Sequence, residues 1–174
     1  AALNFSDNLW LDTTSALSDD ITVWNDKEPT ASLVYFGSGH YCNGNTNTYV
    51  AYCWHSVEGY SKIGGYRGNG QNDGAFIYTG FRPKYVMMKV VTGTYGWPAN
   101  DSVRHPGNPM GTTAHGSIML NDSGTEGGMG NGLGLDLLSN GFKTRDPGTW
   151  ANASGSFYIY YAVAETPSKQ ANAF

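Results

Sequence analysis

The fold is decided by the stretch Ser156-Phe-Tyr-Ile-Tyr-Tyr-Ala-Val163, in which aromatic and β-branched residues follow one another almost without interruption. Residues of this kind favour extended strands, and a run that is apolar on both faces is typical of a buried strand. This run predicts the central strand of a sheet. A second run, Tyr85-Val-Met-Met-Lys-Val-Val91, has the same character and predicts another strand buried on both faces.

Shorter alternating segments lie between turns rich in Gly, Asn and Pro, and they predict the remaining strands. Residues 48–55 alternate most clearly, because Tyr49, Ala51, Cys53 and His55 would share one face of a strand. Only residues 13–20 could hold a helical turn. The other expected strands are residues 32–36, 74–78, 117–120, 136–138 and 141–143, and the expected loops are residues 64–74, 92–114 and 124–134.

The composition favours an all-β fold. The 174 residues include 24 Gly and 12 Tyr, and only 14 % are charged, which suits short strands and tight turns better than helices. We expect an antiparallel β-sandwich, jelly-roll-like, with little or no helix, formed as a single domain over residues 1–174. A polar turn leads into a Tyr-rich segment near residue 48 and again near residue 156. This echo predicts two similar halves, residues 1–60 and 75–167, in what is expected to be the C-terminal part of a longer chain.

Charge and hydropathy narrow the classes of partner. The net charge is −4, and the ten Lys and Arg residues form no basic run, so no nucleic-acid partner is expected. No apolar stretch is long enough to cross a bilayer, so no membrane insertion is expected either. Four Asn-x-Ser/Thr sequons, at Asn4, Asn100, Asn121 and Asn152, are interpreted as turn residues in an Asn-rich chain.

Two histidines and two cysteines have a spacing that suggests three alternatives. If His40-Tyr41-Cys42 paired antiparallel with Cys53-Trp54-His55, both Cys and both His would converge on one face. A disulfide between Cys42 and Cys53 is one outcome, and a pair of unpaired buried thiols is another. A tetrahedral zinc site is the third, although the short spacing is unlike common zinc-finger patterns.

Large aromatic side chains in expected loops are the best candidates for ligand binding, since they cost hydration unless they pack or meet a partner. Such flat faces suit a sugar ring or a protein surface. The Asn/Asp clusters at residues 69–73 and 121–122 could bind calcium, but ordinary turn chemistry is the favoured interpretation. The candidate ligand-binding residues are Tyr60, Tyr66, Tyr95, Trp97 and Trp150.

Three blocks of sequence resemble a known family. They are Tyr49-Val-Ala-Tyr-Cys-Trp-His-Ser-Val-Glu-Gly-Tyr-Ser-Lys62, Phe76-Ile-Tyr-Thr-Gly-Phe-Arg-Pro83 and Leu138-Ser-Asn-Gly-Phe-Lys143. Together they are similar to the C-terminal domain of tail-fibre-like and hypothetical virion proteins of marine bacteriophages, over roughly residues 48–167. The resemblance implies a structural or host-recognition module on the outside of a virus particle, and it supplies no catalytic residues.

Three functions follow as hypotheses. The first is a tail-fibre module that recognises a host-surface glycan or protein and associates with other virion subunits, as a homo-oligomer with a trimer favoured. The second is a purely structural virion protein, such as a capsid decoration. The third is a polysaccharide depolymerase, which the sequence disfavours because it contains no nucleophile elbow and its carboxylates lie mostly in expected turns. We therefore expect a protein that is not an enzyme and needs no cofactor.

Overall fold

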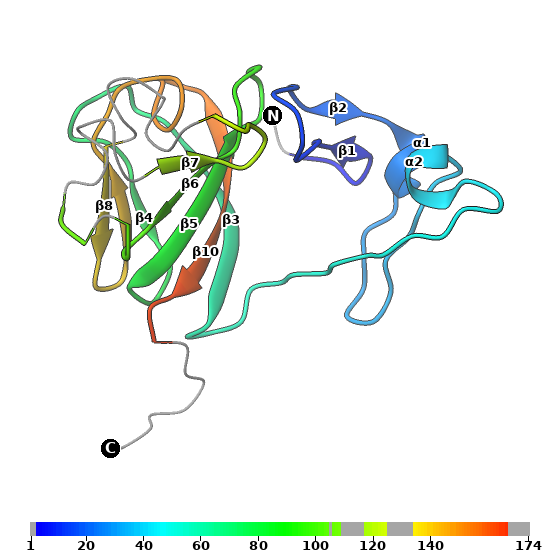
Figure 1. Ribbon diagram of the computed structural model, residues 1–174, viewed down its shortest axis with the longest axis horizontal. Coiled ribbons are helices and arrows are strands. Elements are labelled where there is room, and N and C mark those ends of the chain that lie inside the picture. Colours follow the sequence, from blue (N-terminus) through cyan, green and yellow to red (C-terminus); the bar gives the residue numbers. More distant parts are fainter. Residues whose placement is uncertain (1–2, 105, 109–116, 125–133, 167–174) are drawn as a thin grey trace.

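The structure, a computed structural model, describes residues 3–104, 106–108, 117–124 and 134–166. Its elements run in chain order as two short strands, two single-turn helices and eight further strands (Figure 1). They are β1 (Asp7–Asn8), β2 (Ser18–Asp19), α1 (Ile21–Trp24), α2 (His40–Asn43), β3 (Ser61–Arg67), β4 (Phe76–Tyr78), β5 (Pro83–Val90), β6 (Pro98–Asp101), β7 (Ser117–Met119), β8 (Leu135–Leu138), β9 (Gly141–Thr144) and β10 (Phe157–Ala164).

Two antiparallel sheets form a β-sandwich. One has five strands in the order β3-β10-β5-β6-β7, and the other has three in the order β4-β9-β8. The first strand of the sandwich pairs with the last, β3 with β10, and the second pairs with the last but one, β4 with β9. This wrapped pairing is that of a jelly roll, whereas β5-β6-β7 is a simple meander. The prediction of an all-β antiparallel sandwich with little helix is confirmed.

The core lies between the two sheets and draws on both. Strand β10 is central, as predicted, because it pairs along its length with β3 on one side and β5 on the other. Its alternate residues Tyr158, Tyr160 and Ala162 point into the core. The buried cluster comprises Ile77, Val86, Met88, Leu135, Leu137, Phe142, Ala151, Tyr160 and Ala162.

Two strands lie where loops were expected, in residues 64–74 and 92–114. Strand β3 contains Gly64 and Gly65, which lower strand propensity in the sequence. The structure explains both glycines, because a Cβ on Gly64 would lie 2.9 Å from the Tyr160 hydroxyl and one on Gly65 would lie 2.5 Å from the Phe157 ring. The second missed strand, β6, begins at a proline and has no apolar alternation.

Three local predictions in the first 60 residues are wrong. Residues 32–36 and 48–55 are extended but join no ladder, and residues 13–20 contain strand β2 instead of a helical turn. The helix α1 begins just after them, where Asp20 caps it by accepting a hydrogen bond from Thr22 N at 2.9 Å. The echo between the two halves therefore pairs a true strand, β10, with an unpaired segment. The expected loop at 124–134 lies largely outside the described residues, as do residues 109–116.

Candidate functional site

An N-terminal arm, residues 3–56, lies beside the sandwich and has almost no core of its own (Figure 1). Within residues 3–60, all of which the structure describes, Val23 is the only buried hydrophobic residue. Residues 29–57 contain no Asp, Glu, Lys or Arg. Of the eighteen large hydrophobic residues exposed in the described chain, twelve lie in the arm: Leu3, Phe5, Leu11, Ile21, Leu33, Val34, Phe36, Tyr41, Tyr49, Val50, Tyr52 and Trp54.

The arm is fastened to the sandwich at its beginning and its end. Near the beginning, Trp97 donates its indole N–H to Trp10 O at 2.9 Å, and Leu17 N donates to Val91 O at 2.8 Å. Trp97 was expected to face a ligand from a loop, but only 6 % of it is exposed because it lies under the arm. Its role in this structure is therefore to hold the arm.

The end of the arm is an extended strap, residues 48–56, that leads into β3. No backbone N–H or C=O of residues 48–54 makes a hydrogen bond to the described chain. Its side chains alternate, and Val50, Tyr52 and Trp54 are 78 %, 76 % and 62 % exposed. The Tyr52 and Trp54 rings stack with centroids 6.3 Å apart, and Trp54 rests on Tyr161 of β10 at 6.0 Å.

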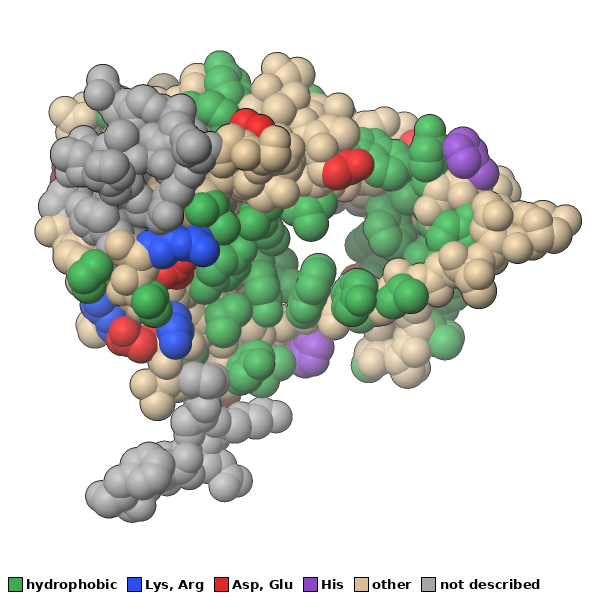
Figure 2. Space-filling model, viewed as in Figure 1, with side chains coloured by type: hydrophobic (Ala, Val, Ile, Leu, Met, Phe, Trp, Pro, Cys, Tyr) green, Lys and Arg blue, Asp and Glu red, His purple; other side chains and the backbone are tan. Residues whose placement is uncertain are grey.

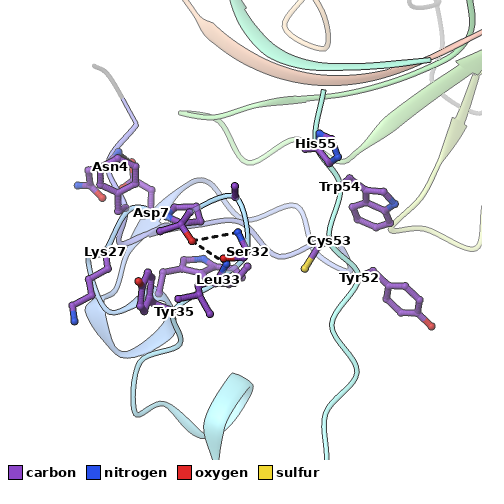
Figure 3. A pocket seen from close by; sticks show the side chains of 16 residues that line it. Asn4, Asp7, Lys27, Ser32, Leu33, Tyr35, Tyr52, Cys53, Trp54 and His55 are labelled. Atoms are coloured by element: carbon purple, nitrogen blue, oxygen red, sulfur yellow. Dashed lines mark hydrogen bonds between the residues drawn. The ribbon is translucent and has the colours of Figure 1, made fainter. Parts of the chain in front are cut away.

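A cleft of about 880 Å³ separates the strap from the loop that follows α1. Figure 3 shows Cys53 pointing toward the loop that carries Leu33 and Tyr35, while Tyr52 and Trp54 point the other way. On the loop side Lys27 Nζ lies 5.4 Å from the centroid of the Tyr35 ring. The lining is mostly apolar, with a few polar side chains, which is the usual character of a ligand-binding pocket.

The disulfide and zinc predictions for His40, Cys42, Cys53 and His55 are not realised. Residues 40–43 form helix α2 instead of a strand, so they cannot pair with residues 53–55. Both cysteines are free thiols: Cys42 is half-buried with Sγ 3.2 Å from Val23 O, and Cys53 is exposed in the cleft. Within the described residues, no group of three or more His, Cys, Asp or Glu side chains could hold a metal ion.

The other four predicted ligand-binding aromatics do not form one site. Tyr95 and Trp150 meet edge to face at 5.2 Å, and Trp150 also packs against the core. Tyr66 is on β3, not in a loop, and stacks on Tyr158 at 5.0 Å. Only Tyr60, at the turn that follows the strap, is exposed. Most of the exposed aromatic side chains lie instead in the arm, among them Tyr49, Tyr52 and Trp54 of the strap. The sequence signal that could have drawn attention to them is the absence of charged residues from 29–57.

The structural role of the buried Tyr66 hydroxyl can be tested through the pH dependence of protein stability. Its hydroxyl is buried and donates to Ala151 O at 2.7 Å, and burial raises its pKa well above the ordinary value. The unfolded chain then loses this proton first as pH rises, so stability is lost above about pH 10. We expect Tyr66→Phe to be about 1 kcal/mol less stable at neutral pH and to lose less stability in alkali. Urea unfolding at both pH values measures this, and an unchanged gap would contradict it.

The side chains of the two Asn/Asp clusters, residues 69–73 and 121–122, make turn hydrogen bonds and ion pairs within the chain. Asn69 Oδ1 accepts from Gln71 N at 3.0 Å, and Asn121 Oδ1 accepts from Trp97 N at 2.7 Å. Asp73 lies 2.7 Å from Lys143 Nζ, and this hydrogen bond, together with the nearby Arg145, holds the Asp73 pKa below its ordinary value. These contacts fit the turn interpretation favoured from the sequence.

The fold and this surface define the class of protein: an antiparallel β-sandwich that carries an apolar arm free of charge over half its length. The chain belongs to the family described as "Domain of unknown function (DUF7483)", which it matches over residues 1–167. Searches of curated proteins and of solved structures found no match. Among the described residues, no helix is both long and apolar enough to cross a membrane.

Proposed function

We propose that this chain is a structural module on the outside of a bacteriophage particle, of the tail-fibre type, and that it works by binding. The observation that carries the proposal is the arm, which exposes twelve large hydrophobic residues and buries only one, Val23. A concentration of exposed apolar side chains is typical of a site that meets another molecule. The resemblance of residues 48–167 to virion proteins supports the location.

Host-surface recognition is the form of this role that the cleft favours. Its volume of about 880 Å³ is that of a typical small-molecule site, and its loop side presents Trp24 and Tyr35 beside Asn4, Asp7 and Lys27. Aromatic faces give a sugar ring an apolar platform, and the polar groups can bind its hydroxyls. A purely structural role, such as a capsid decoration, uses the same exposed arm without a receptor.

Labelling of intact particles tests the proposal. An antibody raised against the 174-residue chain and detected with gold in the electron microscope is expected to mark the exterior of particles of the phage that encodes it. Gold at the tail supports a fibre module, and gold over the shell supports a capsid decoration. If purified, intact particles carry no label and their protein composition lacks this chain, the proposal is wrong.

Receptor binding is tested on host cells with matched variants. The labelled chain is expected to bind the host surface, and Tyr35→Ala, in the cleft, is expected to weaken that binding at least about tenfold, or about 1.4 kcal/mol. The control is Tyr78→Ala, which removes an exposed tyrosine of β4 that does not line the cleft. Equal binding by both variants would exclude the cleft as the receptor site.

A further inference from the structure

Three aromatic rings form a strip that crosses from the strap to the sandwich. Tyr52 and Trp54 point to the same side of the strap, and their ring planes differ by only 13°. In Figure 3 the two rings are offset along the strap, and neither covers the face of the other. Trp54 in turn lies 6.0 Å from the ring of Tyr161 on β10, with an angle of 33° between the planes. We call these three residues the aromatic strip.

The strip is open to solvent over much of its length. Tyr52 and Trp54 are more than half exposed, and Tyr161 is half-buried. Figure 2 shows a row of hydrophobic side chains along the strap, from the sandwich to the arm, beside an opening between the two. Large aromatic side chains that stay exposed in a group are typical of a surface that meets a partner. Such a partner needs a flat, apolar face.

The residues around the strip are uncharged. The strap belongs to residues 29–57, which contain no Asp, Glu, Lys or Arg. The residues that pair with Tyr161 across the sheet, Ile63 on β3 and Met87 on β5, carry no charge either. A single-stranded nucleic acid also stacks on aromatic rings, but its sites combine the rings with a positively charged groove for the phosphates. The strip therefore fits an uncharged ligand.

The strap also offers hydrogen-bonding groups beside the rings. The backbone N–H and C=O groups of residues 48–54 make no hydrogen bond within the described chain. In an extended segment these groups point along the two edges, at right angles to the side chains. A hydroxyl group can donate to the C=O groups and accept from the N–H groups. The strap thus combines an aromatic platform with donors and acceptors for hydroxyl groups.

We propose that the aromatic strip binds an uncharged polysaccharide, whose sugar rings lie on the aromatic faces while their hydroxyls meet the strap backbone. A sugar ring has an apolar C–H face and a rim of hydroxyls, so it matches both features of the strap. A protein partner fits less well, because aromatic hot spots are enclosed by neighbouring contacts that exclude water. The strap is a single extended segment with a cleft on one side and the opening on the other.

This inference rests on the binding role proposed above and names the class of ligand. It also adds a second contact surface, since Tyr52 and Trp54 point away from the loop across the cleft, whereas Cys53 points toward it (Figure 3). A polysaccharide is long enough to touch more than one surface of the molecule. The strip and the cleft can therefore be tested separately, with Trp54 for the first and Tyr35 for the second.

Affinity electrophoresis in native gels tests the inference. The gels contain dextran, galactomannan, hydroxyethyl cellulose or the uncharged polysaccharide fraction of the host envelope, with alginate as the charged comparison. At least one uncharged polymer is expected to retard the wild-type chain, and Tyr52→Ala with Trp54→Ala is expected to weaken that binding at least about tenfold. No retardation by any uncharged polymer, or retardation by alginate alone, overturns the inference.

Two further variants control this experiment. Phe76→Ala with Tyr78→Ala removes two exposed rings of β4, outside the arm, and is expected to bind as the wild type does. Trp54→Tyr keeps an aromatic face and is expected to retain most of the binding. Circular dichroism verifies that every variant is folded. Equal weakening by the strip pair and the β4 pair, in folded proteins, overturns the inference.

Hydrogen exchange and chemical treatment of the host fraction test the two parts of the contact. The amides of residues 48–54 are expected to exchange more slowly when an uncharged polymer is bound, and unchanged exchange at saturation overturns the inference. Periodate, which cleaves sugar rings between neighbouring hydroxyls, is expected to abolish binding of the host fraction, whereas protease treatment is not. Binding that is lost to protease and kept after periodate identifies a protein partner and overturns the inference.

These outcomes are distinguishable from failure of the proposed virion role. Binding of an uncharged polysaccharide through the strip, by a chain that is absent from particles, would remove the virion role and leave the strip. Labelled particles, with a chain that binds no uncharged polymer, would leave the virion role and remove this ligand. Host-cell binding that depends on Tyr35 and not on Trp54 would locate recognition in the cleft and overturn the inference.

Discussion

Replacing Phe142 with Ala is expected to lower the free energy of unfolding by about 3–5 kcal/mol. Phe142 lies on β9 with no exposed surface, and its ring meets Tyr66 at 6.1 Å and Tyr160 at 5.2 Å, both edge to face. These rings come from the opposite sheet, so the cavity would open where the two sheets meet. The Tyr66 and Tyr160 rings are attached to the paired strands β3 and β10, which limits how far they can move into the cavity.

The loss is large because a domain of this size is stable by only about 5–15 kcal/mol. Urea unfolding followed by tyrosine and tryptophan fluorescence measures it. The matched control is Phe76→Ala on the neighbouring strand β4, where 47 % of the side chain is exposed and the expected loss is about 1 kcal/mol or less. Equal losses in the two variants would mean that the core does not lie between these sheets.

The sandwich could be predicted from the sequence because the apolar pattern of its strands indicates that they are buried. The run from Phe157 to Ala164 is apolar at every position but still alternates in depth, and β5, β8 and β9 also lie where they were expected. Local propensity and the global fold agree in these strands. Strand β3 was not predicted because Gly64 and Gly65 interrupt its apolar pattern. Glycine is needed there to leave room for the rings of Tyr160 and Phe157, which lie about 95 residues further along the chain.

The arm could not be predicted, and the reason is physical. Residues 48–55 have the best alternation in the first half, but alternation states which face a side chain takes and not whether a partner strand exists. Likewise, the Cys42 and Cys53 convergence required a pairing that helix α2 prevents. The predicted binding residues Trp97 and Tyr66 were misplaced for the same reason. Both pack against other parts of this chain, and such long-range contacts cannot be read from a local sequence pattern.

Asn152 shows how one polar side chain connects two loops of the sandwich. It has no exposed surface, and its Nδ2 donates to Asn69 Oδ1 at 2.9 Å and to Gln71 O at 2.8 Å. Its Oδ1 accepts from Asn69 N at 3.0 Å. This burial fits the interpretation of the Asn152 sequon as a turn residue, because a glycan cannot be attached to a fully enclosed side chain. Each of its polar atoms has a partner, so a change at Asn152 leaves several groups unsatisfied.

Asn152→Asp is expected to cost about 3–5 kcal/mol at neutral pH, as for an unpaired buried charge. The second carboxylate oxygen would face the two oxygens that Nδ2 now serves, and burial among acceptors would raise the pKa of the new carboxyl in the folded state. A raised folded pKa makes the folded state bind the proton more tightly, so the variant's loss of stability is expected to shrink as pH falls toward about 4.

Urea unfolding at neutral and acid pH measures this loss. The control is Asn45→Asp at an exposed position, where the stability is expected to change by about 0.5 kcal/mol or less. A deficit that is small at neutral pH, or that grows as pH falls, would show that Asn152 does not hold the two loops together.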